Sequence, residues 1–358
     1  MYCTNSIISN IYKTVEENVN VFKGIGLYEG VSGFSLLNYY LYLDTKESKY
    51  LDATIKYVEQ AFDSLSQCNS TLQFSFHNII EIGRYLCFLN SEGIINDKDL
   101  SIAILDLNPL YNDFFLKNQN DLSSLFGLIA LGHFYLENNQ KEYITKIKQI
   151  INRIDTLSIH QESSIFWVSK YENTDKIYPN LFNGSCGIIF FLALCYEKNI
   201  FKKKCLELIH KAIDYLYQNT ISNNFNTFPV EIINNKRISY TNLAYGDIGI
   251  AYSLYRVGIL IGSNNYKNKG INIFKKISEF RDDNNTYIKD AEIVYGSSGL
   301  FAIYSDLYQK TNINQFNLTA NYWLKKTISH NNINNTWAGY DTYINGFDDI
   351  IQLSFAHV

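Results

Sequence analysis

Two kinds of apolar pattern alternate along the chain. Some stretches are apolar on nearly every side, such as FSLLNYYLYL, IIFFLALCY and IAYSLYRVGIL. Others are amphipathic, such as residues 48–65, where Leu51, Ile55, Val58 and Phe62 recur at helical spacing between charged residues. A helix that is apolar all round is buried on all sides, whereas an amphipathic helix faces water on one side. The alternation therefore predicts a layer of buried helices and a layer of outer helices.

The amphipathic stretches define the expected outer helices. The six clearest are residues 5–17, 48–65, 141–154, 202–217, 267–280 and 315–328. Only 3 prolines occur in the chain, which suits long uninterrupted helices. Two segments, 165–168 and 225–238, depart from helical spacing, and we expect them to be extended and to form small hairpins.

Each buried stretch follows a four-residue element, here called a tetrad, that contains glycine. The clearest tetrads are GVSG at 30–33, GSCG at 184–187, GDIG at 246–249 and GSSG at 296–299. Weaker copies are IEIG at 80–83, SLFG at 124–127 and GFDD at 346–349. The copies lie about 50 residues apart, the length of a helical hairpin. Glycine at these positions lets neighbouring segments of the backbone approach closely. Close packing is therefore enough to explain each tetrad taken alone.

A repeat of this kind predicts one architecture for the whole chain. A single hairpin cannot bury its apolar face alone, so residues 1–358 are expected to form one domain. Counting the N-terminal helix as outer gives seven outer and seven inner helices, enough to close an all-α α/α toroid. A straight solenoid would give no reason for one class of helix to be wholly apolar.

Composition excludes several functional classes. The formal net charge is −4 and the pI is near 5.9, so there is no basic face for nucleic acid. The longest apolar run is too short to span a bilayer, and the N-terminal residues lack the apolar core of a signal peptide. The 6 cysteines form no CxxC pair and are expected to be reduced and buried. We therefore expect a cytoplasmic protein without a transmembrane segment.

Three motifs resemble the lanthionine synthetase C-like (LanC-like) family. Residues 242–251, NLAYGDIGIA, resemble its W-C-Y-G-x-P-G-I-A element. Residues 294–300, VYGSSGL, resemble C-H-G-x-x-G-L, and residues 26–33, GLYEGVSG, resemble the opening G-L-x-x-G-x-x-G. The order and spacing of all seven units agree, so the resemblance covers nearly the whole chain.

The resemblance implies a seven-hairpin toroid with a site at one mouth. In the family, two cysteines and a histidine bind zinc there. The zinc activates a cysteine of the substrate peptide as a thiolate, which adds to dehydroalanine or dehydrobutyrine and closes a thioether ring. Zinc deprotonates a coordinated thiol at neutral pH, and three protein ligands leave the fourth position open for it.

This chain departs from the family at the residues that carry that chemistry. The cysteine positions hold Ala244 and Val294, and the histidine position holds Tyr295. Alanine and valine have no donor atom, and tyrosine is not a usual zinc ligand. We therefore expect no zinc cofactor and no metal ligands at these positions. The glycines around them stay in register, so the differences do not come from a shifted alignment.

At three further positions the family often carries a histidine, an arginine or an acidic residue. The histidine before the fourth tetrad falls at Asn183, the arginine before the W-C-Y-G element at about Tyr240, and the acidic residue of the third unit near Asn120 or Asp121. At the predicted mouth, the candidate substrate-binding residues are Asn183, Tyr240, Asp121, Ala244 and Val294.

Three residues are candidates for chemistry. The phenol of Tyr295 could act as a weak general acid toward a developing enolate. Tyr245 could donate a hydrogen bond to a peptide, and Asp247 adds a carboxylate. Asp247 also lies where a helix N-terminus favours a carboxylate, so helix capping is the alternative interpretation. Asp290 and Glu292 complete the polar residues expected at the mouth.

A different set of residues could in principle rebuild a metal site. Cys186 lies inside the fourth tetrad, His77 precedes the second, and His133 lies in the third buried stretch. The alternative is that Cys186 is a small packed residue and that both histidines are hydrogen-bonded near the core.

Three functional hypotheses remain, and whether the protein is an enzyme stays open. The first is a LanC-like protein of lanthipeptide (thioether-bridged peptide) biosynthesis that binds a dehydrated precursor peptide or a partner enzyme, with the zinc-dependent chemistry lost, as in a pseudoenzyme. The partner would be a separate dehydratase or a second cyclase. The second is a zinc-independent cyclase that orients the thiol. The third is a carbohydrate-active α/α-toroid enzyme, which needs paired carboxylates and aromatic platforms. Its candidate platforms, Trp167, Trp323 and Trp337, do not lie at tetrads.

Overall fold

The structure is a computed structural model that describes most of the chain. The described residues are 2–21, 24–28, 30–67, 76–138, 140–169, 175–221, 226–232, 240–281, 286–332, 338–343 and 350–351. They separate into two compact units. The first comprises Met1–Lys117, Ile333–Gly339 and Gln352–Val358, and the second comprises Asn118–Asn332 and Tyr340–Ile351. The expectation of a single domain over 1–358 stays a prediction.

The first unit consists of helices. They are α1 (Tyr2–Asn18), the short 3-10 helix η1 (Val19–Val21), α2 (Val31–Thr45), α3 (Ser48–Gln67), α4 (Phe76–Ser91) and α5 (Asp97–Lys117). Helices α2 and α3 pack through Phe34 and Tyr57, whose ring centroids are 4.8 Å apart. Helices α4 and α5 pack through Phe76 and Phe114, and the Tyr111 hydroxyl donates to the carbonyl of Ile79.

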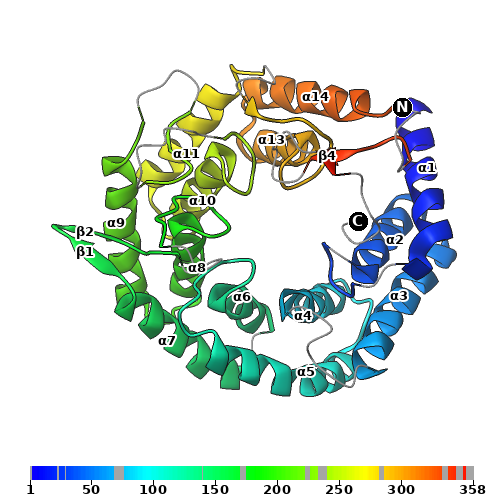
Figure 1. Cartoon of the computed structure of the whole chain (residues 1–358), viewed down its shortest axis with the longest axis horizontal. Coiled ribbons are helices and arrows are strands. Elements are labelled where there is room, and N and C mark those ends of the chain that lie inside the picture. Colours follow the sequence, from blue (N-terminus) through cyan, green and yellow to red (C-terminus); the bar gives the residue numbers. More distant parts are fainter. Residues whose placement is uncertain are drawn as a thin grey trace. The chain divides into compact units, whose positions relative to one another are not determined.

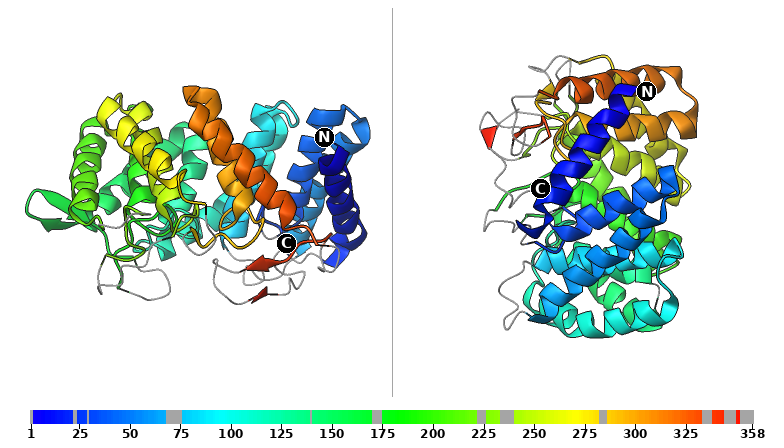
Figure 2. Two further views of the ribbon diagram at one scale, coloured as in Figure 1. Left: turned by 90° about the horizontal axis from the view of Figure 1, so that it is seen from above. Right: turned by 90° about the vertical axis from the view of Figure 1, so that its right-hand side faces the viewer.

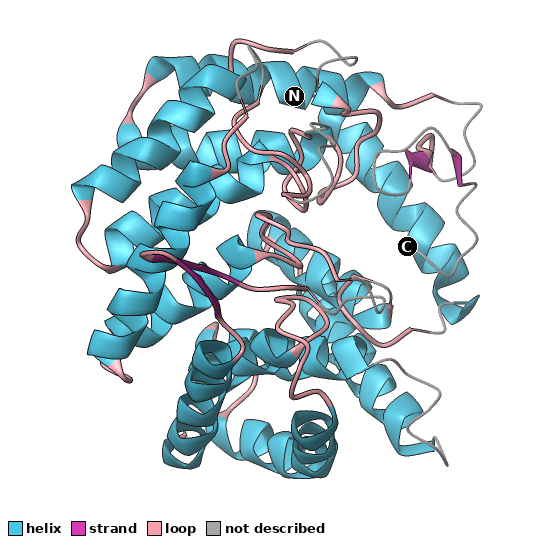
Figure 3. Ribbon diagram, turned by 60° about the vertical axis from the view of Figure 1, so that its left-hand side comes forward, coloured by secondary structure: helices cyan, strands magenta, loops and turns pink. Residues whose placement is uncertain are grey.

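The second unit is built from four helical hairpins (Figure 1). Their helices are α6 (Leu128–Asn138), α7 (Lys141–Thr156), α8 (Ser185–Glu197), α9 (Lys202–Gln218), α10 (Asp247–Leu260), α11 (Asn264–Ile277), α13 (Ser297–Thr311) and α14 (Asn314–Ser329). In this unit α6, α8 and α10 lie side by side, and α7, α9 and α11 lie outside them (Figure 1). Figure 3 shows that most of the described chain is helical and that the strands are few and short.

Burial separates the two helix classes as the sequence predicts. Buried residues occupy nearly the whole length of α6 and α8, on all sides. On α7 they follow one face: Tyr143, Ile147, Ile150, Ile151 and Ile154. All six predicted outer helices are present, with ends within about four residues of the expected ones. The described residues contain thirteen α-helices, so the all-α prediction is confirmed.

The predicted strands are confirmed in one place. Strand β1 (Ile159–Gln161) pairs antiparallel with β2 (Ser164–Phe166), which includes half of the predicted 165–168 segment. Phe166 stacks on Tyr215 of α9 with ring centroids 4.6 Å apart. Of the predicted 225–238 hairpin, residues 226–232 are described, and they form no strand; residue 225 and the rest lie outside the described residues.

Two predicted tetrads differ from the structure, and a third lies outside the described residues. Gly83 lies inside α4, which begins seven residues earlier at Phe76, so IEIG is not a helix start. Gly127 directly precedes α6 and occupies the place of the first glycine of a tetrad, whereas the sequence pattern predicts it at the last place. The tetrad at 346–349 lies outside the described residues. The predicted helix after it is wrong at Ile350–Ile351, where two β-branched residues form strand β4 against β3 (Thr342–Tyr343).

The glycines of the clear tetrads are required by a close backbone approach. A Cβ built on the last glycine of a tetrad would collide with the carbonyl oxygen six residues earlier: Leu243 for Gly249 and Ile293 for Gly299. The first glycines meet the chain six residues earlier in the same way, as Gly246 meets Tyr240. Each loop therefore folds back over the start of the helix that follows it, and only glycine leaves room for it.

We predict that Gly299→Ala destabilises the protein although it replaces a glycine inside a helix. Alanine should gain up to about 1 kcal/mol in helix propensity, but its methyl group would overlap the Ile293 carbonyl, and overpacking against backbone costs about 1–3 kcal/mol. The free energy of unfolding, measured in urea, should fall.

Ser298→Ala in the same turn is the matched control and should leave the unfolding free energy within about 0.5 kcal/mol of wild type. Equal or greater stability of Gly299→Ala would contradict the steric explanation of the tetrads.

Candidate functional site

The loops before α6, α8, α10 and α13 share one hydrogen-bond pattern. The N–H of the residue after the first glycine donates to the carbonyl seven residues earlier: Ser185 to Tyr178, Asp247 to Tyr240 and Ser297 to Asp290, each at 2.9 Å. Leu128 makes the same bond to Asp121 at 2.8 Å, which fixes Gly127 as a first glycine. The loops therefore hold equivalent residues at equivalent places, at one end of the helices of the second unit (Figure 2).

A polar side chain four residues before each first glycine stabilises the loop. Asn180 and Asn242 accept from the N–H groups of Asn183 and Tyr245 at 2.8 and 2.9 Å. Glu292 accepts from Tyr295 at 2.5 Å, and Ser123 accepts from Phe126 at 3.2 Å. Sequence reasoning missed Ser123, Asn180 and Asn242, and it noted Glu292 only as a polar residue of the mouth. A polar residue at a fixed distance before each first glycine was the available signal.

Backbone hydrogen bonds connect neighbouring loops. Ser124 N–H donates to the Phe182 carbonyl at 2.7 Å, and Leu243 N–H donates to the Val294 carbonyl at 3.2 Å. Both donors lie three residues before the first glycine of their own loop, and both acceptors lie two residues before the first glycine of the next loop along the chain. The structure therefore brings Asp121 and Asn183 onto one connected pair of loops, and Ala244 and Val294 onto another. All eight predicted site residues lie in the second unit.

Two pairs of tyrosines lie at the starts of α10 and α13. Tyr245 and Tyr295 have ring centroids 5.8 Å apart with planes inclined by 31°. Tyr240 meets Tyr287 edge to face at 5.3 Å, and burial raises the pKa of the Tyr240 phenol above its usual value. The Tyr287 side chain is exposed. The arrangement presents aromatic faces and hydroxyl groups, which suit a peptide that combines apolar and polar groups.

Asp247 is buried, and its carboxylate holds a distant segment. Its side chain is 1% exposed. One oxygen accepts from Thr227 N–H at 2.5 Å and the other from Phe228 N–H at 3.1 Å. The Lys276 ammonium donates to the Asn226 carbonyl at 2.9 Å, beside the carboxylate. Asp247 thus begins α10 without a bond from its carboxylate to that helix, and it positions residues 226–228.

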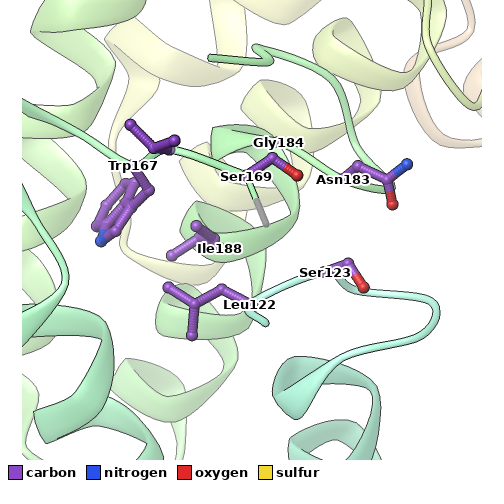
Figure 4. Close-up of a pocket in the computed structure, with 8 residues that line it drawn as sticks. Leu122, Ser123, Trp167, Ser169, Asn183, Gly184 and Ile188 are labelled. Atoms are coloured by element: carbon purple, nitrogen blue, oxygen red, sulfur yellow. The ribbon is translucent and has the colours of Figure 1, made fainter. Parts of the chain in front are cut away.

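A small cavity adjoins Asn183 (Figure 4). Its volume is about 10 Å³, room for one water molecule. Trp167 and Ile188 line one side, and Ser123 and Asn183 line the other. Asn183 is 8% exposed, and its Oδ1 has no hydrogen-bond partner among the described residues. The Trp167 indole N–H donates to the Ile154 carbonyl at 2.8 Å, so the indole is held in place. This tryptophan was not predicted as a site residue.

The remaining predicted residues are held by their own loops. The Asp121 carboxylate accepts from Ser123 N–H at 2.8 Å, within its own turn. Asp290 is 3% exposed and accepts from Glu292 N–H at 3.1 Å. Ala244 is fully buried, and Val294 is half-buried. Tyr240, Tyr245 and Tyr295, by contrast, are half-buried.

The comparisons with known proteins agree with this loop geometry. The sequence profile described as "Lanthionine synthetase C-like protein" matches residues 21–348. The chain belongs to the lanthionine synthetase C-like family. A search of curated protein sequences found no match.

Among solved structures, one titled "Nisin cyclase" is similar with a TM-score of 0.73 and 16% sequence identity, over 92% of this chain and 88% of that one. This likeness confirms the predicted α/α-toroid fold class. A second, titled "Crystal structure of sugar epimerase from ruminal bacterium", has a TM-score of 0.41 and 12% identity over 70% of this chain and 75% of that one, too low to support an argument.

Three residues stand at the positions that the resemblance matches to the zinc ligands. Ala244 and Val294 offer only hydrocarbon, and Tyr295 offers one phenol, whose ring lies against Tyr245. These residues do not fit a zinc ion, which needs three thiolate, imidazole or carboxylate ligands. The expectation that the protein carries no zinc cofactor stays a prediction.

The alternative metal ligands are not assembled in the described part of the second unit. Cys186 is fully buried, and burial raises the pKa of its thiol far above the usual value. The His133 ring packs edge to face on Phe191 at 5.6 Å. His77 lies on α4 in the first unit. Among the described residues, no three His, Cys, Asp or Glu side chains form a group that could hold a metal ion.

Two further findings concern the cysteines and the membrane. The four cysteines with described side chains, Cys87, Cys186, Cys195 and Cys205, are buried and form no disulfide among the described residues, as predicted. The side chain of Cys3 and the whole of Cys68 lie outside the described set. In the described part of the chain, no helix combines the length and the apolar character needed to span a bilayer.

We predict a pH-dependent stability that comes from Asp247. Burial raises the pKa of its carboxyl from 3.8 to about 7, although the Thr227 and Phe228 N–H groups oppose the shift. A folded-state pKa above the unfolded value means that the stabilising contribution is fully present below about pH 4 and is lost as the pH rises to about 7. In that window the unfolding free energy should fall by at most about 1.4 kcal/mol per pH unit.

Urea unfolding of wild type and Asp247→Asn at several pH values between 4.5 and 8 tests this. The difference in unfolding free energy, wild type minus variant, should decrease from pH 4.5 to 7 and then level off. A difference that stays constant with pH would show that Asp247 titrates at its ordinary value.

Proposed function

We propose that this protein acts in lanthipeptide biosynthesis by binding a dehydrated precursor peptide at the mouth formed by the loops before α6, α8, α10 and α13, without zinc-dependent cyclisation. Family membership over residues 21–348 supports the biosynthetic setting. The observation that carries the proposal is that Ala244, Val294 and Tyr295 stand at the positions that the resemblance matches to the zinc ligands, in loops that are joined by backbone hydrogen bonds.

Peptide binding without metal has a physical basis at this mouth. A peptide backbone needs hydrogen-bond partners and its side chains need apolar surface. The hydroxyl groups of Tyr240, Tyr245 and Tyr295 supply the first, and the tyrosine rings supply the second. We assign these three tyrosines to substrate binding, together with Asn183, Asp121, Ala244 and Val294 as parts of the supporting loops. Asp247 acts through the 226–228 segment and is a positioning residue.

The direct test uses a synthetic peptide with one dehydroalanine and one cysteine, beside a twin with serine in place of dehydroalanine. Binding is followed by fluorescence anisotropy, free thiols by alkylation and mass spectrometry, and zinc by elemental analysis. We expect binding, a thiol loss no faster than without protein, and no zinc. Faster thiol loss without zinc would instead establish a zinc-independent cyclase, and absence of binding to any dehydrated peptide would reject the proposal.

We predict that Tyr245→Ala and Tyr295→Ala each weaken peptide binding about 5- to 10-fold, because each removes an aromatic contact of about 1 kcal/mol. Anisotropy titrations measure the effect. Tyr40→Ala, at an exposed tyrosine on α2 of the first unit, is the matched control and should bind as wild type does. Equal weakening by all three substitutions would argue against a specific site at the mouth.

We also predict that the triple substitution Ala244→Cys, Val294→Cys and Tyr295→His creates a zinc site with about one zinc per chain, because three such ligands suffice for a tetrahedral site with one open position. Zinc is measured after dialysis against a weak chelator. Ala244→Cys alone is the control and should retain none. A triple variant that folds, as judged by circular dichroism, but takes up no zinc would show that the residue-by-residue correspondence with the family is wrong.

A further inference from the structure

Helix α5 carries an apolar stripe on its exposed side. Leu116, Leu105 and Ile102 are 72%, 67% and 52% exposed, and the first two are the most exposed large apolar side chains of the described residues. Pro109 and Asn112 are also exposed. The five positions follow a 3-4-3-4 spacing, so they form one line about 21 Å long on the helix surface.

The stripe is not needed for the packing of α5 in its own unit. A separate face of the helix packs in the core through Ile104, Leu107, Tyr111, Phe114 and Phe115. Tyr111 and Phe114 contact α4. A helix that packs against the core on one side needs one apolar face, whereas α5 has this buried face and the exposed stripe. Exposed apolar lines of this length on a helix typically contact another helix.

The charges beside the stripe define the partner. Asp99, Asp106 and Asp113 recur every seven residues along one edge, at the position that flanks the contact in a helix pair. Asp113 is paired with Lys117 at 2.7 Å. Asp99 and Asp106 are exposed and have no ion pair among the described residues. The opposite edge, with Ser101 and Asn108, is uncharged, and Lys98 lies at the N-terminal end.

We propose that this face of α5 is the docking surface for an amphipathic helix of a partner protein, with apolar residues at 3-4 spacing and lysine or arginine along the edge that meets Asp99 and Asp106. A second copy of this chain fits less well, because antiparallel pairing of two α5 helices would bring the two aspartate edges together. The surface lies in the first unit, whereas all candidate site residues lie in the second. It therefore stands independently of the peptide-binding proposal.

The test uses a synthetic helical peptide about four turns long, with leucine at 3-4 spacing and lysine on both edges, labelled for fluorescence anisotropy. Its twin has glutamate in place of lysine. The full-length protein should bind the lysine peptide with at least about 10-fold higher affinity than the glutamate twin. Amide hydrogen exchange should slow in α5 when the lysine peptide is bound.

Two variants and one control locate the binding. The double substitution Leu105→Ser and Leu116→Ser should abolish binding, and Asp106→Lys should weaken it about 10-fold. Leu318→Ser, at a 56% exposed leucine of outer helix α14, should bind as wild type does. All changed side chains are exposed, and thermal unfolding checks that each variant is folded.

Two outcomes would overturn the proposal. One is that the lysine peptide does not bind, or binds the wild type and the double variant equally. The other is that light scattering shows a wild-type dimer that the double variant does not form, which would make a second copy of the chain the occupant.

Discussion

The architecture depends on one close approach that is repeated along the chain. The backbone of each loop passes over the first turn of the helix that follows it, near enough that only a hydrogen atom fits at the glycines. The same glycines also receive the neighbouring loop: a Cβ on Gly187 would meet Ser124, and a Cβ on Gly249 would meet Leu181. Packing within a loop and packing between neighbouring loops therefore both require glycine at these positions. This explains why the four clear tetrads of this chain, GVSG, GSCG, GDIG and GSSG, keep both glycines although the two residues between the glycines differ.

The helical layers could be predicted from the sequence because they rest on local properties. Apolar periodicity separates α6 and α8 from α7 and α9, and charged residues mark the outer class. The register of the weaker tetrads could not be predicted from glycine alone. Glycine serves both at the first and at the last position of a tetrad, so Gly127 fits either. A polar residue four positions earlier does not decide it either, since Ser123 precedes Gly127 and Asn120 precedes position 124 at that distance. The hydrogen bond from Phe126 N–H to Ser123, equivalent to that from Asn183 N–H to Asn180, decides it in the structure.

The role of Asp247 illustrates what local patterns leave out. Its place at the start of α10 suggests helix capping, but its carboxylate binds N–H groups about 20 residues earlier in the chain. No periodicity or motif reports such a contact, because it depends on how the 226–228 segment crosses the helix. The three positions that the resemblance matches to zinc ligands are the opposite case. Ala244, Val294 and Tyr295 can be read from the sequence as soon as the tetrads give the register.

Scaffold and chemistry are separable at this mouth for a physical reason. Ala244 and Val294 take part in loops that are held by backbone hydrogen bonds, such as that from Leu243 to the Val294 carbonyl, and these bonds do not depend on which side chain the position carries. A ligand can therefore be replaced there without a change in the loop that presents it. The rings of Tyr245 and Tyr295 pack against each other in these loops. Ala244, Val294 and Tyr295 do not offer the three donors that zinc needs, which is why we propose peptide binding without zinc-dependent cyclisation for this mouth.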